Sequence, residues 1–307
     1  MKTDSYCSRI LLLGAAGQVG QAWQRVAKPG QVVAAMDRQV LDLSQTELLA
    51  ERLEQAIETF EPTAIVNAAA YTAVDQAEDN EAAAYAINAL APGIMATIAA
   101  SHKLPLVHYS TDYVFDGHGE SPFAETDPPN PLSVYGRSKL AGERAVQAAA
   151  GPHLILRTSW VFGAQGQNFL KTMLRLAQTR DELRVVNDQI GAPTSAELLA
   201  TLPLTLLSKL SGHSDARWGL YHACPEGYTS WHAYACYVIG RARASGWPIR
   251  LADDAIIGIP SREFPVKATR PHNSRLSTDK LKNAFDLSLP TWQSGVDRVL
   301  AALEISE

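Results

Sequence analysis

The chain has 307 residues, of which 46% are hydrophobic and 19% are charged, a composition typical of a globular protein with a large core. Its net charge of −5, without any basic tract, argues against a nucleic acid or an anionic membrane as partner. The apolar run that ends at Leu13 is too short for a signal peptide or a membrane span. The cysteines lack metal-binding spacing, so we expect a cytoplasmic protein with reduced thiols at Cys7, Cys224 and Cys236.

Short apolar runs alternate with amphipathic segments in the first half of the sequence. The runs predict strands at 9–14, 31–37, 64–70, 104–111 and 153–160. The segments between them predict helices, and we expect the helix over 45–60 to begin at a capping box formed by Ser44 and Glu47. This alternation of helices with continuously apolar strands predicts an α/β fold whose doubly wound parallel sheet is covered on both faces.

Strands become sparser after about residue 160, where the loops carry more Pro, Trp and His. The pattern predicts one strand at 183–188 and helices at 168–178, 195–210, 230–246 and 291–304. Ser230 is the expected N-cap and Gly246 the expected C-cap of the third of these helices. We therefore expect a first domain at 1–160, with a return near 182–200 where a strand rejoins its sheet. A smaller, mixed α/β domain at 161–307 is expected to cover the carboxyl edge of the sheet.

A glycine-rich stretch directly follows the first predicted strand and opens a helix, with glycines at Gly14, Gly17 and Gly20. Glycine permits a tight turn and lets a pyrophosphate approach the backbone, while a helix N-terminus offers N–H donors and partial positive charge. A plain strand–helix turn is the alternative. The position after the first strand favours dinucleotide binding.

The second predicted strand ends in Asp37 and Arg38, about 20 residues past the glycines, where a nucleotide-binding fold contacts the adenosine ribose. An acidic residue there can accept a hydrogen bond from a ribose hydroxyl, whereas an arginine suits a 2′-phosphate. Because both are present, NADH and NADPH both remain open.

Hydroxyl and carboxylate groups lie at the carboxyl end of the strand at 104–111, in the order Ser110, Thr111, Asp112. Ligands of open α/β sheets bind outside the carboxyl ends of the strands, although a capping role is the alternative for these residues. The next helix opens with Tyr135 and Lys139, whose spacing of four places them on one helix face. Thr111 and the Tyr/Lys pair can therefore converge above a nicotinamide.

Hydride transfer between a nicotinamide and a carbonyl requires a matched proton transfer at the oxygen. Tyr135 is the expected proton donor for reduction, and Thr111 is expected to hydrogen-bond the carbonyl oxygen. Lys139 is expected to lower the pKa of Tyr135 and to bind the nicotinamide ribose.

With these motifs the sequence resembles the extended short-chain dehydrogenase/reductase superfamily and, within it, the dTDP-4-dehydrorhamnose reductases. The resemblance spans essentially the whole chain, and its most specific stretches are "STDYVF", "NDQIGAPT" and "RPHNSRLST". It implies a Rossmann-type fold with a second, substrate-binding domain and NADPH or NADH as cofactor. The implied reaction reduces the 4-keto group of dTDP-6-deoxy-L-lyxo-4-hexulose to dTDP-L-rhamnose, for cell-surface polysaccharide such as lipopolysaccharide.

The resemblance also implies roles for single residues. The catalytic set is Thr111, Tyr135 and Lys139. The cofactor-binding set is Gly14, Gly17, Gln18, Val19, Gly20, Asp37, Arg38, Asp42, Leu43, Ala68, Ala69 and Ala70, together with Tyr135 and Lys139. The substrate-binding set is Thr111, Asp112, Tyr113, Tyr135, Trp160, Arg270 and Asn273, with Ser274 beside it.

Two members of the substrate set have a physical rationale and an open alternative. An indole face can pack on a sugar ring, so Trp160 is expected at the sugar unless it is an ordinary core residue. A guanidinium can bind phosphate oxygens in bidentate fashion, so Arg270 is expected at the diphosphate unless it forms a salt bridge. Asn168 and the segment 187–189 suit the holding of loops as well as contact with a ligand.

Some members of the family bind Mg²⁺ through three glutamates near a dimer interface. The matching positions here are Ala22, Glu197 and Ala302. Because Mg²⁺ needs several oxygen ligands in octahedral arrangement, we expect no metal site and a monomer or weak homodimer.

Two other functions remain as alternatives. The regulatory subunit of methionine adenosyltransferase shares this fold and binds the cofactor without catalysis, but such a role does not need Thr111, Tyr135 and Lys139. Another nucleotide-sugar reductase or an epimerase would use the same Tyr/Lys pair, so only the specific stretches quoted above argue against it.

Overall fold

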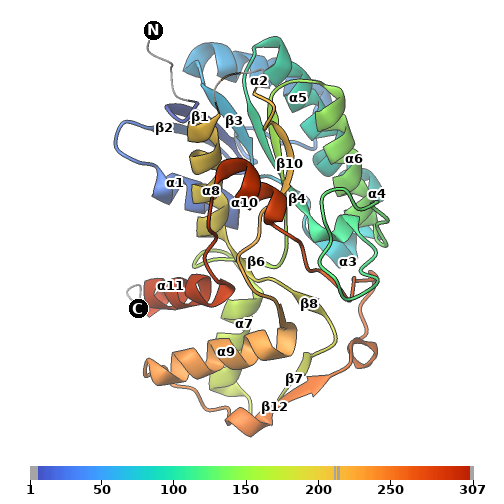
Figure 1. Ribbon diagram of the computed structural model, residues 1–307, viewed down its shortest axis with the longest axis vertical. Helices are drawn as coiled ribbons and strands as arrows, with labels where there is room; N and C mark the ends of the chain where they lie inside the picture. Colours follow the sequence, from blue (N-terminus) through green and yellow to red (C-terminus); the bar gives the residue numbers. More distant parts are fainter. Residues whose placement is uncertain (1–5, 211, 213–214, 305–307) are drawn as a thin grey trace.

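The computed structural model describes residues 6–210, 212 and 215–304. The first five residues lie outside it, so the expectation that no signal peptide is present falls partly outside the described residues. Six parallel strands form the central sheet, in the spatial order β2-β1-β3-β4-β5-β10 (Figure 1). They are β1 (Arg9–Leu13), β2 (Val32–Met36), β3 (Ala64–Asn67), β4 (Leu106–Thr111), β5 (His153–Thr158) and β10 (Gly219–His222). The predicted Rossmann-type α/β fold is confirmed. The chain leaves β1 toward β2 on one side and later returns to β3 on the other, which makes a switch point of the kind where such sheets bind ligands.

Both faces of the sheet are covered, which explains why the strands read as continuous apolar runs. Successive strand residues point to opposite faces, so Leu12 packs into one core and Leu11 and Leu13 into the other. Helices α1 (Gln18–Val26) and α8 (Ala196–Lys209) cover the first face. The second face carries α2 (Thr46–Phe60), α5 (Ala91–Ser101) and α6 (Val134–Ala148).

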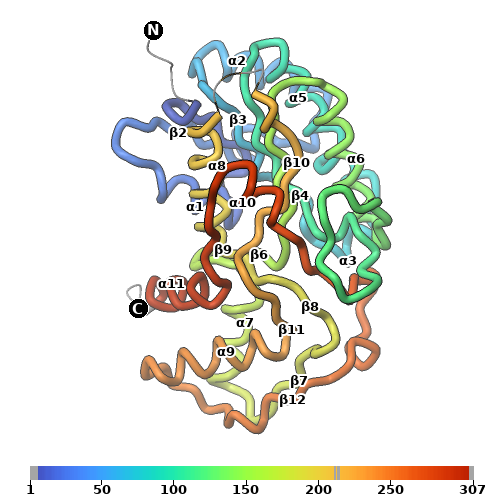
Figure 2. The backbone as a smooth tube through the Cα atoms, in the orientation of Figure 1, coloured from blue at the N-terminus to red at the C-terminus, as the bar shows by residue number. Residues whose placement is uncertain are grey.

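The lower part of the molecule in Figures 1 and 2 contains α7 (Phe169–Thr179), α9 (Trp231–Ala244) and α11 (Trp292–Glu304). Their shared core includes Phe162, Tyr234 and Trp292. The short strand pairs are β6 (Val161–Phe162) with β9 (Thr194–Ser195), β8 (Ile190–Gly191) with β11 (Thr229–Ser230), and β7 (Leu183–Val186) with β12 (Ile256–Ile259). The remaining helical segments are α3 (Val74–Ala77), α4 (Glu81–Tyr85), the π-helical η1 (Ala86–Leu90), η2 (Asp112–Val114), η3 (Asp253–Ala255), η4 (Ser261–Glu263) and α10 (Asp279–Phe285).

The strand expected at 183–188 does not rejoin the first sheet, so that expectation was wrong. This strand, β7, pairs in parallel with β12, because Leu183 and Val185 bury their side chains among residues of α7 and α9. The sixth strand of the main sheet is instead β10, which the sequence pattern did not predict. Only α8, within the expected return, packs back onto the sheet, beside α1.

The expected helix caps had mixed outcomes. Ser230 caps α9 by accepting a hydrogen bond from the Ala233 N–H at 3.0 Å, and Gly246, with φ of +86°, directly follows the C-cap of that helix. The capping box at Ser44 was wrong. Both the N–H and the hydroxyl of Ser44 donate to Asp42 Oδ1, at 2.9 and 2.7 Å, and α2 begins without a side-chain cap.

One stretch among the described residues, Glu81–Ser101, is long and apolar enough to cross a membrane by length and composition. In this fold the stretch packs into the protein core, where Ala91, Met95 and Ala99 contribute to the cluster that α2 and α6 share. The stretch is thus a core element that runs through α4, the π-helical turn and α5.

The π-helical turn makes a very close contact with α6. Asn88 lies in this turn, and its side chain bonds both backbone groups of Tyr71 and the Ser138 hydroxyl. The Asn88 carbonyl faces α6 at Gly142, where an added Cβ would lie 2.0 Å from the Asn88 oxygen. Only glycine at 142 therefore lets α6 approach this turn.

We predict that Gly142→Ala destabilises the protein by about 1–3 kcal/mol, because the backbone at Asn88 must move to admit the methyl group. Gly240 in α9 is the matched control, since an added Cβ there meets no heavy atom within 4 Å. Gly240→Ala should raise stability by roughly 0.5–1 kcal/mol through helix propensity. Urea unfolding of both variants measures the difference, and equal effects of the two substitutions would contradict the assigned contact.

Candidate active site

The N-terminus of α6 lies beside the carboxyl end of β4. Ser133 caps α6 by accepting from the Gly136 N–H at 3.2 Å, and the Val134 N–H donates to Glu78 Oε1 at 2.9 Å. Gly136 allows the approach, because an added Cβ there would lie 2.2 Å from the Tyr113 carbonyl oxygen. These contacts place Tyr135, the second residue of α6, against Thr111.

Burial disfavours the phenolate and raises the pKa of Tyr135 to about 12. A hydrogen bond between the Thr111 and Tyr135 side chains favours the phenolate and opposes part of this shift. The expectation that Lys139 depresses this pKa was wrong for the protein without ligands. The Lys139 ammonium donates instead to the Tyr109 carbonyl oxygen at 2.6 Å. Tyr135 therefore keeps its proton at neutral pH, as a proton donor must.

Lys139 lies on the same helix face as Tyr135 and is 2% exposed. Burial lowers the pKa of its ammonium to about 8, and the Glu143 carboxylate opposes that shift. A lysine with such a pKa is mostly charged at neutral pH and loses its proton in mild alkali. Its donor capacity includes two further N–H groups beyond the bond to Tyr109.

Asp112 and Tyr113 continue the chain from Thr111 into η2. Asp112 is 3% exposed and accepts from the Thr111 hydroxyl at 3.1 Å. Burial raises the pKa of Asp112 to about 6, while hydroxyl groups of Ser274 and Thr111 oppose the shift. The Tyr113 ring meets the Tyr135 ring edge to face, with centroids 5.6 Å apart. Thr111, Asp112, Tyr113, Tyr135 and Lys139 thus form one cluster, in which the two tyrosines are half-buried and the other three residues are buried.

The glycine turn has the geometry of a nucleotide-binding loop. Gly14 has φ of +81° and would clash with Ala69 N at 2.5 Å if it carried a Cβ, and Gly20 would clash with the Gly14 carbonyl at 2.2 Å. Gly17 differs, because a Cβ there would meet only Gly14 O, at 3.4 Å, which leaves room above the helix N-terminus. Free N–H groups at the start of α1 and this room fit a pyrophosphate.

The loop after β3 adjoins the glycine turn at the switch point. The Ala68 N–H donates to the Leu13 carbonyl and the Ala69 N–H to Asn67 Oδ1, at 2.9 and 3.1 Å. Ala68, Ala69 and Ala70 therefore lie beside the expected cofactor position, with side chains small enough to leave the backbone accessible. Their expected contact with the cofactor stays a prediction.

The residues expected at the adenosine differ in how freely they can bind. Asp37 Oδ1 accepts from the N–H groups of Gln39 and Val40, so this carboxylate closes a turn. The Arg38 side chain is 79% exposed and reaches Asp42 Oδ2 only at 3.4 Å. Asp42 is occupied by Ser44, whose hydrogen bonds lower the pKa of its carboxyl group, and Leu43 is buried in the core.

Gln18 links the glycine turn to the lower part of the molecule. Its Oε1 accepts from Asn168 Nδ2 at 2.9 Å, while Asn168 Oδ1 caps α7 by accepting from the Lys171 N–H. Asn168 therefore holds a loop, one of the two readings left open for it. Val19, beside Gln18, packs against the first core.

Trp160 is held as a core residue on one side. Its ring stacks on Trp231 with centroids 3.6 Å apart, and a Cβ at Gly191 would lie 2.7 Å from the Trp160 ring. Trp160 also has φ of +50°, a left-handed conformation that costs about 1–3 kcal/mol in a non-glycine residue and persists because its surroundings hold it. Trp231 thus covers one face of the half-buried indole, and only the rest of the ring can contact a sugar.

The segment "RPHNSRLST" crosses the site but uses its polar groups internally. Arg270 makes a bidentate pair with Asp75, with Nη2 to Oδ2 at 2.7 Å and Nη1 to Oδ1 at 3.1 Å, so the salt-bridge alternative describes it in this state. The Asn273 side chain donates to Ser121 O and accepts from Arg275. Within 187–189, Asp188 accepts from Ser261 and holds a loop.

Three buried polar residues lie beneath the cluster, Ser110, Glu143 and Arg157, and the sequence pattern pointed only to the first of them. Arg157 makes a bidentate salt bridge to Glu143, at 2.8 Å from Nε and 2.7 Å from Nη2, and Ser110 donates to the same carboxylate. Glu143 follows Lys139 by one helical turn in "YGRSKLAGE", so helical spacing could have found it. No local signal identifies Arg157, which is distant in sequence.

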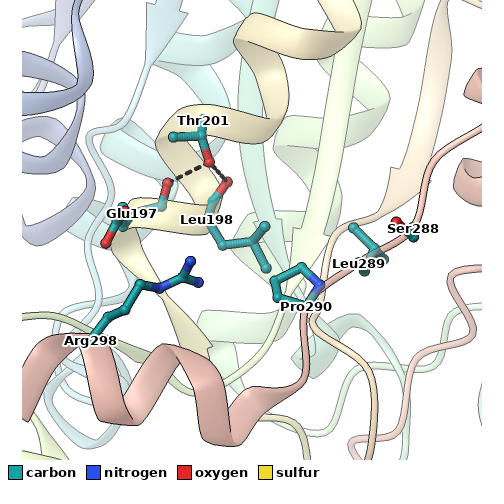
Figure 3. A pocket seen from close by; sticks show the side chains of 7 residues that line it. All are labelled: Glu197, Leu198, Thr201, Ser288, Leu289, Pro290 and Arg298. Carbon is teal, nitrogen blue, oxygen red and sulfur yellow. Dashed lines mark hydrogen bonds between the residues drawn. The ribbon is translucent and has the colours of Figure 1, made fainter.

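A separate pocket of about 430 Å³ lies between α8 and the segment that leads into α11 (Figure 3). It is lined by Glu197, Leu198, Thr201, Ser288, Leu289, Pro290 and Arg298. Glu197 is the one acidic residue of the three metal-matching positions, and the pocket adds the cationic Arg298 without a second carboxylate. Ala22 is buried and Ala302 exposed. These side chains do not suit Mg²⁺, whose absence stays a prediction.

The chain matches known proteins along nearly all its length. Residues 8–305 match the family described as "RmlD substrate binding domain". The dTDP-4-dehydrorhamnose reductase of Shigella flexneri is 45% identical over 294 residues, which are 96% of this chain and 97% of that protein.

Two solved structures show the same arrangement. The dTDP-4-dehydrorhamnose reductase of Bacillus anthracis, in complex with NADP, matches with a TM-score of 0.86 and 32% identity, over 96% of this chain and 99% of that one. The orthologous reductase of Clostridium acetobutylicum matches with a TM-score of 0.84 and 34% identity, over the same shares of the two chains.

Because the folded-state pKa of Asp112 is raised, its burial costs stability once the carboxyl group ionises, that is, as pH rises through about 6. We predict that Asp112→Asn gains stability relative to the wild type by up to about 3 kcal/mol as pH rises from about 4 to about 7. Urea unfolding across this range measures the difference.

Asp75→Asn is the control for this prediction, because Arg270 lowers the pKa of Asp75. Its stability relative to the wild type should fall with rising pH, which is the opposite slope. A flat difference for Asp112→Asn would show that the pKa of this carboxyl group is the same in the folded and the unfolded protein.

Proposed function

This chain belongs to the RmlD substrate binding domain family, and we propose on that premise that it reduces dTDP-6-deoxy-L-lyxo-4-hexulose to dTDP-L-rhamnose with NAD(P)H. The observation that carries the proposal is the hydrogen-bonded Thr111–Tyr135 pair at the carboxyl end of β4, in a fold with a nucleotide-binding glycine turn at its switch point. The reductase from Shigella flexneri, 45% identical over nearly the full length, supports the same activity.

Tyr135 is the proton donor in this proposal. The 4-keto oxygen becomes a hydroxyl during reduction, so it must gain a proton as negative charge develops on it. Burial keeps Tyr135 protonated, and Thr111 can share a hydrogen bond with the same oxygen. A phenol that already lies within hydrogen-bonding reach of Thr111 needs little rearrangement to meet the carbonyl.

Bound NAD(P)H supplies the hydride for this reaction. Gly14, Gly17 and Gly20 hold the backbone of the turn so that the N-terminus of α1 faces the pyrophosphate. Lys139 is the ligand for the nicotinamide ribose, because its ammonium lies one turn from Tyr135 and retains two donors. Its positive charge also stabilises negative charge that develops beside Tyr135.

The remaining roles are proposals for the sugar nucleotide. Asp112 and Tyr113 adjoin the reacting groups and are the contacts for the sugar, with the uncovered part of Trp160 at its border. Arg270 reaches the diphosphate only by giving up Asp75. We assign cofactor binding to residues 1–160 with α8, and substrate binding to 161–307. We also place the protein in the cytoplasm as a monomer or weak homodimer that feeds polysaccharide, including lipopolysaccharide.

The direct test follows NADPH absorbance with dTDP-6-deoxy-L-lyxo-4-hexulose and identifies dTDP-L-rhamnose as product. We predict that Tyr135→Phe lowers turnover by about 10²-fold or more, because it removes the proton donor, while cofactor affinity stays nearly unchanged. Tyr228→Phe is the control, since its hydroxyl bonds the Leu276 carbonyl on a different segment. A rate near that of the wild type for Tyr135→Phe would exclude the assigned role.

Cofactor preference depends on Arg38 in this account, because the Asp37 carboxylate is used by its own turn. We predict that Arg38→Ala raises the KM for NADPH by about tenfold or more and leaves the KM for NADH nearly unchanged, since only NADPH carries the 2′-phosphate. Arg52→Ala, at an exposed position on α2, serves as the charge-matched control. Equal effects of Arg38→Ala on both cofactors would show that Arg38 does not meet the phosphate.

A further inference from the structure

Glu143 lies on the face of α6 that carries the reacting residues. Tyr135, Lys139 and Glu143 follow one another at intervals of four, so they stack along the helix. Glu143 is 1% exposed and Lys139 is 2% exposed. Burying a charged group without a partner raises the free energy of the folded state, so Lys139 and Glu143 each need a group of opposite charge or a hydrogen-bond partner.

Three consecutive residues of β4 each bind one of these three side chains of α6. The Tyr109 carbonyl accepts from the Lys139 ammonium, the Ser110 hydroxyl donates to the Glu143 carboxylate, and Thr111 bonds Tyr135. The three contacts fix α6 along the carboxyl half of β4.

Arg157 ties the neighbouring strand to the same carboxylate. It is the register partner of Ser110 across the β4–β5 pair, and it holds both oxygens of Glu143. Its guanidinium lies over the Phe115 ring, 5.0 Å from the centroid. One carboxylate therefore joins α6, β4 and β5 at the place where β4 turns into the active site.

The charges around this carboxylate come from several elements. Lys139 faces the Glu143 carboxylate from the same helix, and Arg157 faces it from β5. His108, a residue of β4, lies near Lys139. Burial and Lys139 lower the pKa of His108, and burial and Arg157 lower that of His222 on β10 to about 3, so both imidazoles are neutral. Asp112 in η2 and Tyr135 complete the set. Glu143 thus faces two cations, Arg157 and Lys139.

We propose that Glu143 is a positioning residue of the reductase site, which holds Tyr135 and Lys139 against β4 and keeps Lys139 charged, with Arg157 setting how much of the negative charge reaches Lys139. The proposal rests on the function proposed above. Glu143 touches neither substrate nor cofactor in it and acts only through Lys139 and the position of α6.

The test is the alkaline limb of the pH profile of kcat/KM, which Lys139 sets. Glu143→Gln removes the anion and leaves Arg157 and Lys139 as two buried cations, so the limb should move down by about one pH unit. Arg157→Gln leaves the anion to Lys139 alone, so the limb should move up by a similar amount, about one unit. A purely structural clamp loses activity in both variants without displacing the limb in opposite directions.

Unmoved limbs, or limbs that move the same way, would overturn the proposal. Melting curves show which variants fold. If one single variant does not fold, the direction in which the limb of the other moves decides, and the double variant Glu143→Gln/Arg157→Gln, which removes the anion and the guanidinium together, is the control. Its limb should lie near that of the wild type, and a displaced limb there would also overturn the proposal. Ser110→Ala, which removes one hydrogen bond and no charge, should leave the limb in place.

The affinity for NADP⁺ measured against pH gives a readout without turnover. If Lys139 binds the ribose, the midpoint of that dependence should shift down in Glu143→Gln and up in Arg157→Gln. A wild type that binds NADP⁺ but does not reduce the sugar would refute the proposed function alone. The binding midpoints would then still decide the role of Glu143.

Discussion

The contact between helix α6 and the carboxyl half of β4 is the constraint on which the rest of the site depends. Two glycines on α6 let the helix pack closely on the elements beside this contact, because a side chain at Gly136 or Gly142 would run into the backbone carbonyl of Tyr113 in η2 or of Asn88 in the π-helical turn. The polar contacts then fix the register of the helix on the strand. Thr111 and Tyr135 meet only because this close approach brings them together, so packing here determines chemistry.

The cofactor side of the site depends on a second close approach, at the switch point of the sheet. The Gly14 turn packs directly against the backbone of Ala68 and Ala69, and its N–H donates to the Met36 carbonyl at 2.9 Å. The ends of β1, β2 and β3 are thereby joined at the N-terminus of α1. In the proposed function, a nucleotide bound here extends toward β4, where α6 carries Tyr135 and the buried Lys139.

Local sequence patterns predicted the parts of the fold and site that local forces determine. The continuous apolar strands gave the doubly wound sheet, and helical spacing placed Tyr135 and Lys139 on one face. Contacts between distant residues could not be predicted in this way. The pairing of β7 with β12 depends on the burial of Leu183 and Val185 against two helices, and the Arg270–Asp75 pair joins residues from opposite ends of the chain.

Competition between neighbouring groups explains the other differences. Ser44 had the spacing of a helix cap, but Asp42 offered a stronger acceptor two residues away. Lys139 had the spacing to act on Tyr135, but its ammonium donates to the Tyr109 carbonyl, and burial dominates the pKa of the phenol. Trp160 has the chemistry for a sugar, but Trp231 covers one face of its ring. Spacing shows which groups can meet, and the fold decides which of them do.

Transfer of deuterium tests the central claim most directly. NADPH that carries deuterium at the transferring position of its nicotinamide ring is incubated with the protein and dTDP-6-deoxy-L-lyxo-4-hexulose, and the product is examined by NMR. The account predicts dTDP-L-rhamnose with deuterium at C4 of the sugar. Label at another carbon, or oxidised cofactor without labelled sugar, would contradict it.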